Sequence, residues 1–170
     1  MSVTAENKTR LPCSGSYTLL RDSFSRAILT RSEGGMTTEG VREQVVKYLA
    51  RARQALSAGG LALAHDDYVT AVNRAYYATF YSANALLSTK GLERSKHSGV
   101  LAAFRQHFIK TGLIEAEYSD IYGAVMEDRA EGDYNLEFET DADQAERDMV
   151  RAQRFLARAE HALQEMGILP

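Results

Sequence analysis

Proline is almost absent from this sequence, and cysteine occurs only once. The two prolines are Pro12 and Pro170, so one long central stretch lacks the residue that most strongly breaks helices. That stretch is rich in Ala, Leu, Arg and Glu, which favour helices, and no part of it has the pattern of a β-hairpin. A chain of 170 residues has the length of one domain with a sizeable core. We therefore predict an all-α fold, an up-and-down bundle of four to five helices.

Long apolar runs are missing as well. No apolar run approaches the length of a membrane span or of the core of a secretory signal. The single cysteine, Cys13, excludes a disulfide within the chain and is typical of a reducing cytosol. These absences predict a cytoplasmic protein without a membrane partner. The formal net charge of −3 argues against a protein that coats nucleic acid over its whole surface, yet it leaves room for a local basic patch.

The first 38 residues differ in composition from the rest of the chain. They mix Ser, Thr, Gly and Arg with short apolar patches, so we predict a mobile, poorly ordered N-terminal tail over residues 1–38. A helical domain is expected over residues 39–167. Met36 follows Gly34 and Gly35 and stands just before the first strongly periodic segment. A further hypothesis is therefore that translation starts at Met36.

Apolar residues recur at helical spacing in five segments. The first helix is predicted to begin at Thr37 or Thr38 and to end at Gly59 and Gly60. A connection over residues 61–67 then leads to a central helix from about Tyr68 to Thr89. The expected limits of the remaining helices are Gly112 at the end of the third, Arg129 at the end of the fourth, and Thr140 and Gly167 around the last.

The central helix has two faces that both call for an explanation. One face carries Val72, Tyr76, Thr79, Ala83 and Leu86 and is predicted to be buried. The other carries phenols and amides, with a cation beside them: Asn73, Tyr77, Tyr81, Asn84 and Arg74. This second face is either the rim of a helix bundle, whose hydroxyl groups find ordinary partners, or a surface that contacts a polar ligand.

Two groups of charged residues are candidate sites. The first is a basic loop with four cationic or titratable side chains, Lys90, Arg94, Lys96 and His97. It is either a solvated surface or an edge that binds phosphate groups. No histidine or cysteine pair has the spacing of metal ligands, and no glycine-rich phosphate loop is present, so no metal or cofactor is predicted.

The second candidate site is Arg129 with Asp133 and Tyr134. Residues 127–139 contain six carboxylates and one glycine, and we expect a loop of roughly ten residues there, which is long enough to suspect a function. Arg129 either takes part in that function or is bound to neighbouring carboxylates and only fixes the turn into the last helix.

Four short segments together resemble successive signatures of the HEPN superfamily, and more narrowly of its UPF0332 branch. They are Ala-Val-Asn-Arg-Ala-Tyr-Tyr at 71–77, Lys-His-Ser-Gly-Val at 96–100, Lys-Thr-Gly at 110–112 and Arg-Ala-Glu-Gly-Asp-Tyr at 129–134. The resemblance covers residues 41–163. It implies a helical bundle that forms a homodimer, often beside a small nucleotidyltransferase in a toxin–antitoxin module. It also implies metal-independent cleavage of RNA by an arginine followed, after four to six residues, by a histidine.

The sequence departs from that motif at one position. The arginine corresponds to Arg129, but Tyr134 stands where the histidine is expected. A phenol with a pKa near 10 is deprotonated only about once in a thousand molecules at pH 7, so it is a poor base for the 2′-hydroxyl proton. His97 is the best alternative acid–base residue.

The resemblance therefore implies a dimeric domain that binds RNA or a nucleotide and has ribonuclease or toxin activity. Arg129 would contact the phosphate, Asp133 would orient the Arg129 side chain, and Tyr134 would position the substrate. The cleft would be lined by Asn73, Arg74 and Tyr77, with Arg94 and Lys96 as further binding residues. The alternative is a non-catalytic helical module or scaffold that partners a nucleotidyltransferase, in which Tyr134 serves as a nucleotide acceptor.

Overall fold

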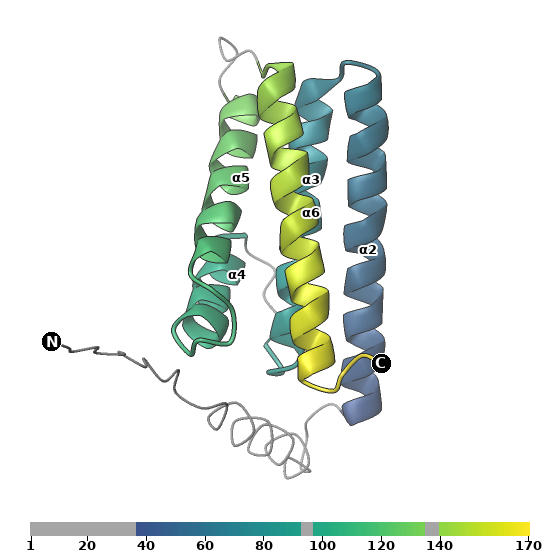
Figure 1. Cartoon of the computed structure of the whole chain (residues 1–170), viewed down its shortest axis with the longest axis vertical. Helices are drawn as coiled ribbons and strands as arrows, with labels where there is room; N and C mark the ends of the chain where they lie inside the picture. The colour runs from purple at the N-terminus through teal and green to yellow at the C-terminus, as the bar shows by residue number, and fades with distance from the viewer. Residues whose placement is uncertain (1–36, 93–96, 135–139) are drawn as a thin grey trace, which may run out of the picture.

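The computed structural model describes residues 37–92, 97–134 and 140–170, except for the side chains of residues 97–98 and 131–134. These ranges contain five α-helices, one π-helical turn and no strand, which confirms the all-α prediction (Figure 1). Residues 1–36 of the predicted tail lie outside the described ranges. The elements are α2 (Thr38–Ala64), α3 (Tyr68–Ser88), α4 (His97–Phe104), the π turn η1 (Arg105–Ile109), α5 (Glu117–Tyr134) and α6 (Ala142–Glu165).

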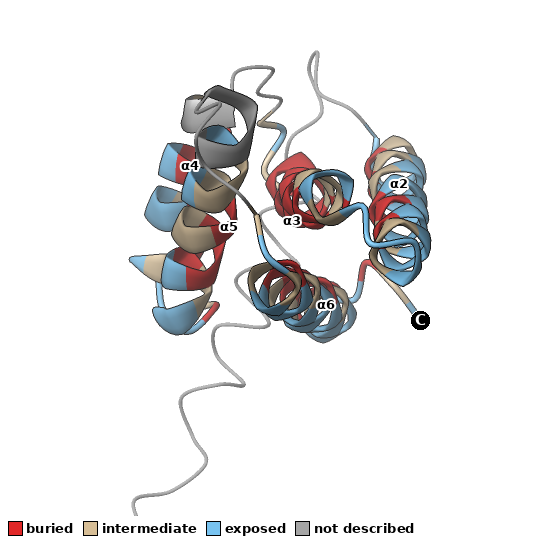
Figure 2. Ribbon diagram, turned by 90° about the horizontal axis from the view of Figure 1, so that it is seen from above, coloured by how far each residue is buried: buried red, intermediate tan, exposed pale blue. Residues whose placement is uncertain are grey.

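Helix α3 stands at the centre of the bundle. It packs against α2, α4, α5 and α6, and the view along the bundle shows α2 on one side of it and α4 and α5 on the other (Figure 2). Its residues from Ala75 to Thr89 are buried with few exceptions. The largest fully buried side chains of the core are aromatic, and each comes from a different element: Tyr76, Phe104, Phe108, Tyr122 and Phe155. None of the helices in the described ranges is long and apolar enough to cross a membrane.

Helix α2 begins as predicted but ends later. The Thr37 hydroxyl accepts a hydrogen bond from the Gly40 amide at 3.1 Å and caps the helix. The predicted end at Gly59 and Gly60 is wrong, because the helix continues to Ala64. Gly59 has a packing role instead of a capping role. A Cβ atom there would lie 2.6 Å from Met149 Sδ and 3.1 Å from Arg74 Cβ, so any larger residue would displace the end of the Met149 side chain and push α2 and α3 apart by a few tenths of an ångström.

Two further limits differ from the prediction. Helix α5 does not end near Arg129 but continues through Gly132 to Tyr134, so the predicted loop around Asp133 and Tyr134 is wrong. One glycine costs a helix only about 1 kcal/mol, which is little beside the packing of α5 on α3 and α6. The cap of α6 is Asp141, not Thr140: the Asp141 carboxylate accepts a hydrogen bond from the Gln144 amide at 2.7 Å. The third helical segment ends at Ile109, and Gly112, whose φ is +71°, lies in the turn that closes it.

Gly59 and Gly60 form a natural pair for testing the close approach of α2. Gly60→Ala should raise the free energy of unfolding by about 0.5–1 kcal/mol, because alanine favours helices and no atom lies within 4 Å of the added Cβ. Gly59→Ala gains the same propensity but overpacks the contact with Met149 and Arg74, so it should lower that free energy by about 1 kcal/mol or more. Urea unfolding followed by circular dichroism measures both. Equal stabilisation by the two substitutions would contradict the packing role of Gly59.

Candidate active site

Arg129 extends from α5 to the polar-aromatic face of α3. Its guanidinium carbon lies 5.2 Å from the centroid of the Tyr76 ring and 5.9 Å from that of Tyr77. Arg74 lies over the same Tyr77 ring at 5.0 Å, and its Nη2 donates a hydrogen bond to Asn73 Oδ1 at 2.6 Å. These five residues form what we call the arginine–tyrosine cluster. The second face of the central helix therefore meets Arg129.

Burial determines the electrostatics of this cluster. Tyr76 is fully buried, and this burial raises the pKa of its phenol to about 12, although the positive charge of Arg129 acts in the opposite direction. Tyr76 is therefore neutral at physiological pH and provides a fixed aromatic surface beneath the guanidinium group. Each cation–π contact contributes on the order of 0.5–2 kcal/mol, which holds Arg129 and Arg74 near one ring despite their like charges.

The cluster has the chemistry of an anion site. Arginine presents planar N–H donors that match the oxygens of phosphate. Arg74 Nε is buried without a hydrogen-bond partner in the described part of the chain, and no ion pair found there joins Arg74 to a carboxylate. Two guanidinium groups at one tyrosine ring concentrate positive charge at the junction of α3 and α5. An oxyanion is the ligand that best complements this arrangement.

A network of polar side chains fixes the turn of α5 that carries Arg129. Gln144 Nε2 donates hydrogen bonds to Asp128 Oδ2 at 2.6 Å and to Asp148 Oδ2 at 3.2 Å. Arg151 Nη1 donates to the same two carboxylates, at 3.2 Å and 2.9 Å. The Asp148 side chain is fully buried. Because Asp128 precedes Arg129 in the chain, these bonds to α6 set the rotation and height of α5 at the cluster.

The remaining predicted site residues are placed only in part. Arg94 and Lys96 lie outside the described residues. His97 is the first residue of α4, and Asp133 and Tyr134 are in the last turn of α5, but their side chains lie outside the description. Tyr134 follows Arg129 by five helical positions, which corresponds to about 140° around the axis and about 7.5 Å along it. The two residues are therefore related by the geometry of a helix, not by that of a loop.

Sequence reasoning missed part of the cluster. The helical pattern predicts a core role alone for Tyr76, yet its ring also supports Arg129. The adjacent tyrosines at 76 and 77 were the available signal, because neighbouring positions on a helix point about 100° apart and can contact one group from two sides. Among the described residues, no group of three or more His, Cys, Asp or Glu side chains has the arrangement of a metal site.

The Asp128 carboxylate should make stability depend on pH. Burial, followed by the nearby charge of Asp148, raises the pKa of Asp128 above 3.8. The folded state therefore binds a proton more tightly than the unfolded state, and stability falls as pH rises from 3.8 through the folded pKa. Asp128→Asn mimics the neutral form and should raise the free energy of unfolding at pH 7, with a gain that disappears towards pH 3.

Urea unfolding at several pH values measures this effect. Glu117→Gln is the matched control, because Glu117 pairs with Arg154 on the surface and should change stability by less than about 1 kcal/mol. A loss of stability in Asp128→Asn that is the same at every pH would contradict the expected cost of ionising Asp128.

Comparison with known proteins identifies the family. The model of the HEPN domain matches residues 45–165. A UPF0332 protein of Thermotoga maritima is 41% identical over 129 residues, which cover 74% of this chain and 96% of that protein. Two proteins of Methanocaldococcus jannaschii, named "Putative toxin MJ0605" and "Putative toxin MJ0142", are 35% and 31% identical and are covered over 97% and 87% of their lengths, with 77% and 75% of this chain matched. The chain therefore belongs to the HEPN family, within its UPF0332-like branch.

Proposed function

We propose that this HEPN protein is a metal-independent endoribonuclease of the toxin type that acts as a homodimer. The observation that carries the proposal is the arginine–tyrosine cluster, in which Arg129 and Arg74 meet at the Tyr77 ring. Two similar proteins of M. jannaschii carry the words "Putative toxin" in their names. A homodimer would bring two such clusters to one cleft and double the positive charge available to an RNA strand.

In the proposed reaction the 2′-hydroxyl oxygen of RNA attacks the adjacent phosphorus atom. The bond from phosphorus to the 5′-oxygen breaks, so the products are a 2′,3′-cyclic phosphate and a free 5′-hydroxyl group. One proton leaves the 2′-oxygen, another is delivered to the 5′-oxygen, and no electron is gained or lost. Arg129 would stabilise the additional negative charge on the phosphate oxygens, and Arg74 would bind the same or the next phosphate.

The proton transfers require a separate group, because an arginine is protonated at all physiological pH values. His97 is the proposed acid–base residue, since an imidazole titrates near neutrality. Asp133 would orient Arg129, to which it is related by one helical turn, and Tyr134 would position the substrate. Arg94 and Lys96 would bind phosphates that flank the scissile bond.

Substitution of Arg129 tests the proposal. The purified chain should cleave single-stranded RNA in the presence of EDTA, and Arg129→Ala should lower the rate about a hundredfold or more, because a preorganised donor to the transition state is lost. Arg129→Lys should recover little activity, since lysine lacks the planar pair of donors. His97→Ala should remove the pH dependence near neutrality. Gel analysis of a labelled RNA with mapped 3′ ends measures both rate and chemistry.

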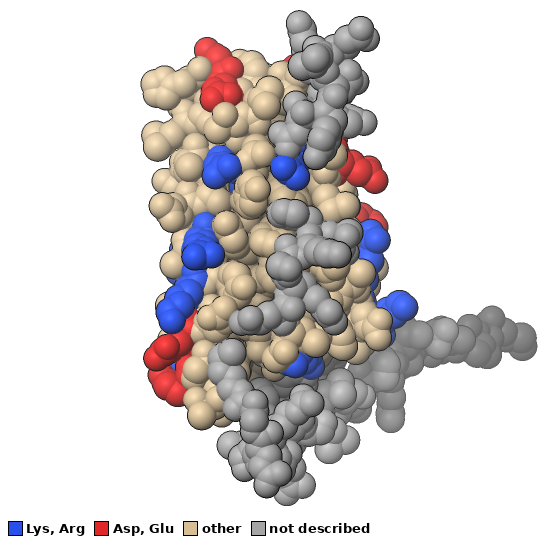
Figure 3. All heavy atoms as spheres, turned by 180° about the vertical axis from the view of Figure 1, so that it is seen from behind, with Lys and Arg blue, Asp and Glu red and all other residues tan. Residues whose placement is uncertain are grey.

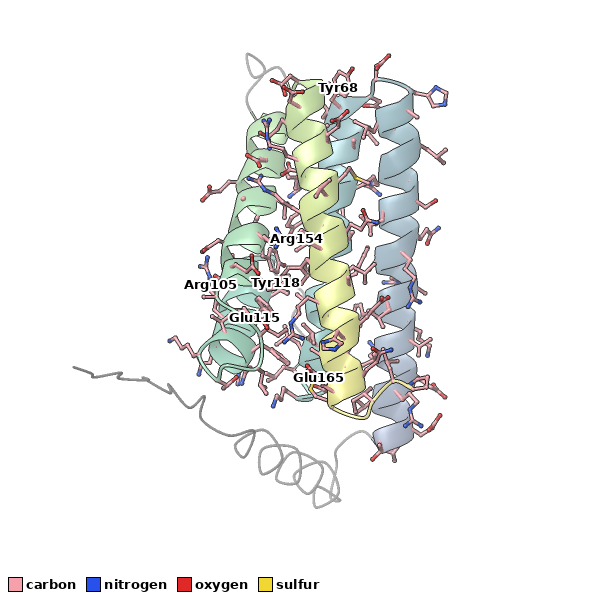
Figure 4. The ribbon with its side chains drawn as sticks, viewed as in Figure 1. Tyr68, Arg105, Glu115, Tyr118, Arg154 and Glu165 are labelled. Atoms are coloured by element: carbon pink, nitrogen blue, oxygen red, sulfur yellow. The ribbon has the colours of Figure 1, made fainter. Side chains whose placement is uncertain are left out.

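Arg154→Ala is the matched control for this experiment. Arg154 extends from α6 and pairs with Glu117 at 3.0 Å, well exposed to solvent (Figure 4). Its substitution should leave cleavage unchanged, and thermal melting should show that every variant is folded. Equal cleavage by the Arg129→Ala and unmodified proteins, or no cleavage by the unmodified protein, would refute the ribonuclease proposal.

One observation favours a second candidate function. Tyr134 occupies the position of the catalytic histidine in the family motif, and a tyrosine hydroxyl can accept a nucleotidyl group. The chain would then be a non-catalytic module whose partner is a nucleotidyltransferase. Co-expression with a nucleotidyltransferase encoded beside it should add the mass of one nucleotide monophosphate to the unmodified chain but not to Tyr134→Phe. Modification that persists in Tyr134→Phe would contradict this role.

A further inference from the structure

Three tyrosine rings continue from the arginine–tyrosine cluster towards α2. The centroids of Tyr77 and Tyr81 are 6.0 Å apart, and those of Tyr81 and Tyr48 are 6.4 Å apart. Both pairs are inclined by the same 30°. All three side chains are half-buried, so each ring is anchored in the bundle and still exposes part of its surface. We call these three residues the tyrosine ladder.

Arginines accompany the ladder along its length. Arg51 of α2 lies over the Tyr81 ring at 5.9 Å, and Arg74 lies over Tyr77 at 5.0 Å. No ion pair found in the described ranges involves either arginine. By contrast, the arginines Arg53, Arg151, Arg154 and Arg158 all form ion pairs with carboxylates of neighbouring helices or of their own. The charges of Arg51 and Arg74 are therefore offset by aromatic rings and, for Arg74, by the amide oxygen of Asn73, with no carboxylate paired to them in the described ranges. An anionic ligand can still pair with them.

The ladder lies away from the contact between α3 and α6. That contact is made by small α3 residues, Ala71, Ala75 and Ala78, against Ala145 and Ala152 of α6. Tyr77 and Tyr81 follow another side of the helix, since each residue turns it by about 100°. Figure 3 shows the side of the molecule opposite to α6. Lys and Arg lie over its middle and at both edges, whereas Asp and Glu lie only at its margins, among the parts that are not covered by grey atoms.

We infer that the tyrosine ladder is a binding track for single-stranded nucleic acid that leads to Arg129. Aromatic rings in series with cations between them are the arrangement with which proteins bind single strands, because every base has a face that can stack. The ring spacing of 6.0–6.4 Å is almost twice the 3.4 Å step of stacked bases. A strand with one base on each ring must therefore separate its bases, which a single strand permits and a duplex resists.

Charge decides between a nucleic acid and a protein partner. The chain carries a formal net charge of −3. The face on which Arg51 and Arg74 stack on tyrosines is locally positive, in contrast to the charge of the whole chain. A polyanion gains from such a face through the release of counterions. The inference shares its ligand class with the proposed function but assigns residues that take no part in the reaction: Tyr48, Arg51 and Tyr81.

The test uses a labelled single-stranded DNA of about 15 mixed-sequence nucleotides, because DNA lacks the 2′-hydroxyl group that the proposed cleavage requires. Fluorescence anisotropy on the full chain measures Kd. Tyr81→Ala should weaken binding about tenfold, whereas Tyr81→Phe keeps the ring and should stay within about twofold of the unmodified protein. Arg51→Ala should weaken binding and reduce the slope of log Kd against log salt by about one. Arg154→Ala should change neither quantity.

The same oligonucleotide annealed to its complement should bind more weakly, and Tyr81→Ala should not alter that affinity. The inference is overturned if the unmodified protein does not bind the single strand, or if Tyr81→Ala and Arg51→Ala bind it as the unmodified protein does. It is also overturned if both substitutions change the oligomeric state in analytical ultracentrifugation, which would make the ladder an interface between copies. Ladder-dependent binding without RNA cleavage would refute only the ribonuclease proposal, and cleavage without ladder-dependent binding only this inference.

Discussion

The arrangement of the whole bundle depends on how closely α2 and α6 approach α3. Small side chains make this approach possible: Gly59 of α2 packs against Met149 and Arg74 without a Cβ, and Ala75 and Ala78 of α3 face Ala152 of α6. Close packing on one side of α3 directs its large rings to the other sides. Tyr76 and Phe80 therefore join the aromatic core with Tyr122, while Tyr77 and Tyr81 reach the surface between α2 and α5. One steric constraint thus determines both the core and the aromatic surface.

The position of Arg129 follows from a second constraint, which acts through α5. Asp128 is held to α6 by Gln144 and Arg151, and the buried Asp148 accepts hydrogen bonds from the same two residues. This network contains two carboxylates and one guanidinium group. One of the carboxylates, Asp128, has a raised pKa and directly precedes Arg129 in the chain. The hydrogen bonds of the network orient the helix more than they stabilise it, because partly buried charges lose much of their hydration. The geometry of the candidate site is therefore fixed by polar contacts that lie outside it.

The sequence predicts the helices well and their ends less well, for physical reasons that differ between sites. Periodic apolar residues identify α2, α3 and α6, because a buried stripe is the main requirement of each helix. Gly59 misleads because a glycine that permits close packing cannot be told from one that ends a helix until the neighbouring helix is known. Gly132 misleads for another reason: one glycine costs a helix only about 1 kcal/mol, so it does not by itself mark the end of α5.

The candidate site was predictable where it lies on one helix and not where it joins several. The spacing of Asn73, Tyr77 and Tyr81 reveals a second face on α3 from sequence alone. The pairing of that face with Arg129 depends on the rotation of α5, and its continuation to Arg51 and Tyr48 depends on the register between α2 and α3. The spacing of residues within a single helix determines neither the rotation of α5 nor the register between α2 and α3.

The arginines on the two sides of the molecule have different partners. On α6, the arginines at 151, 154 and 158 form ion pairs with Asp128, Glu117 and Glu115 of the chain that leads into or forms α5. Such pairs satisfy charge within the protein. Arg51 and Arg74, by contrast, stack on tyrosines, and no ion pair found in the described ranges joins either of them to a carboxylate. A protein of net negative charge thereby presents cations on the face where Arg129 lies. This difference, more than the overall charge, supports the proposal that an RNA strand binds on that face.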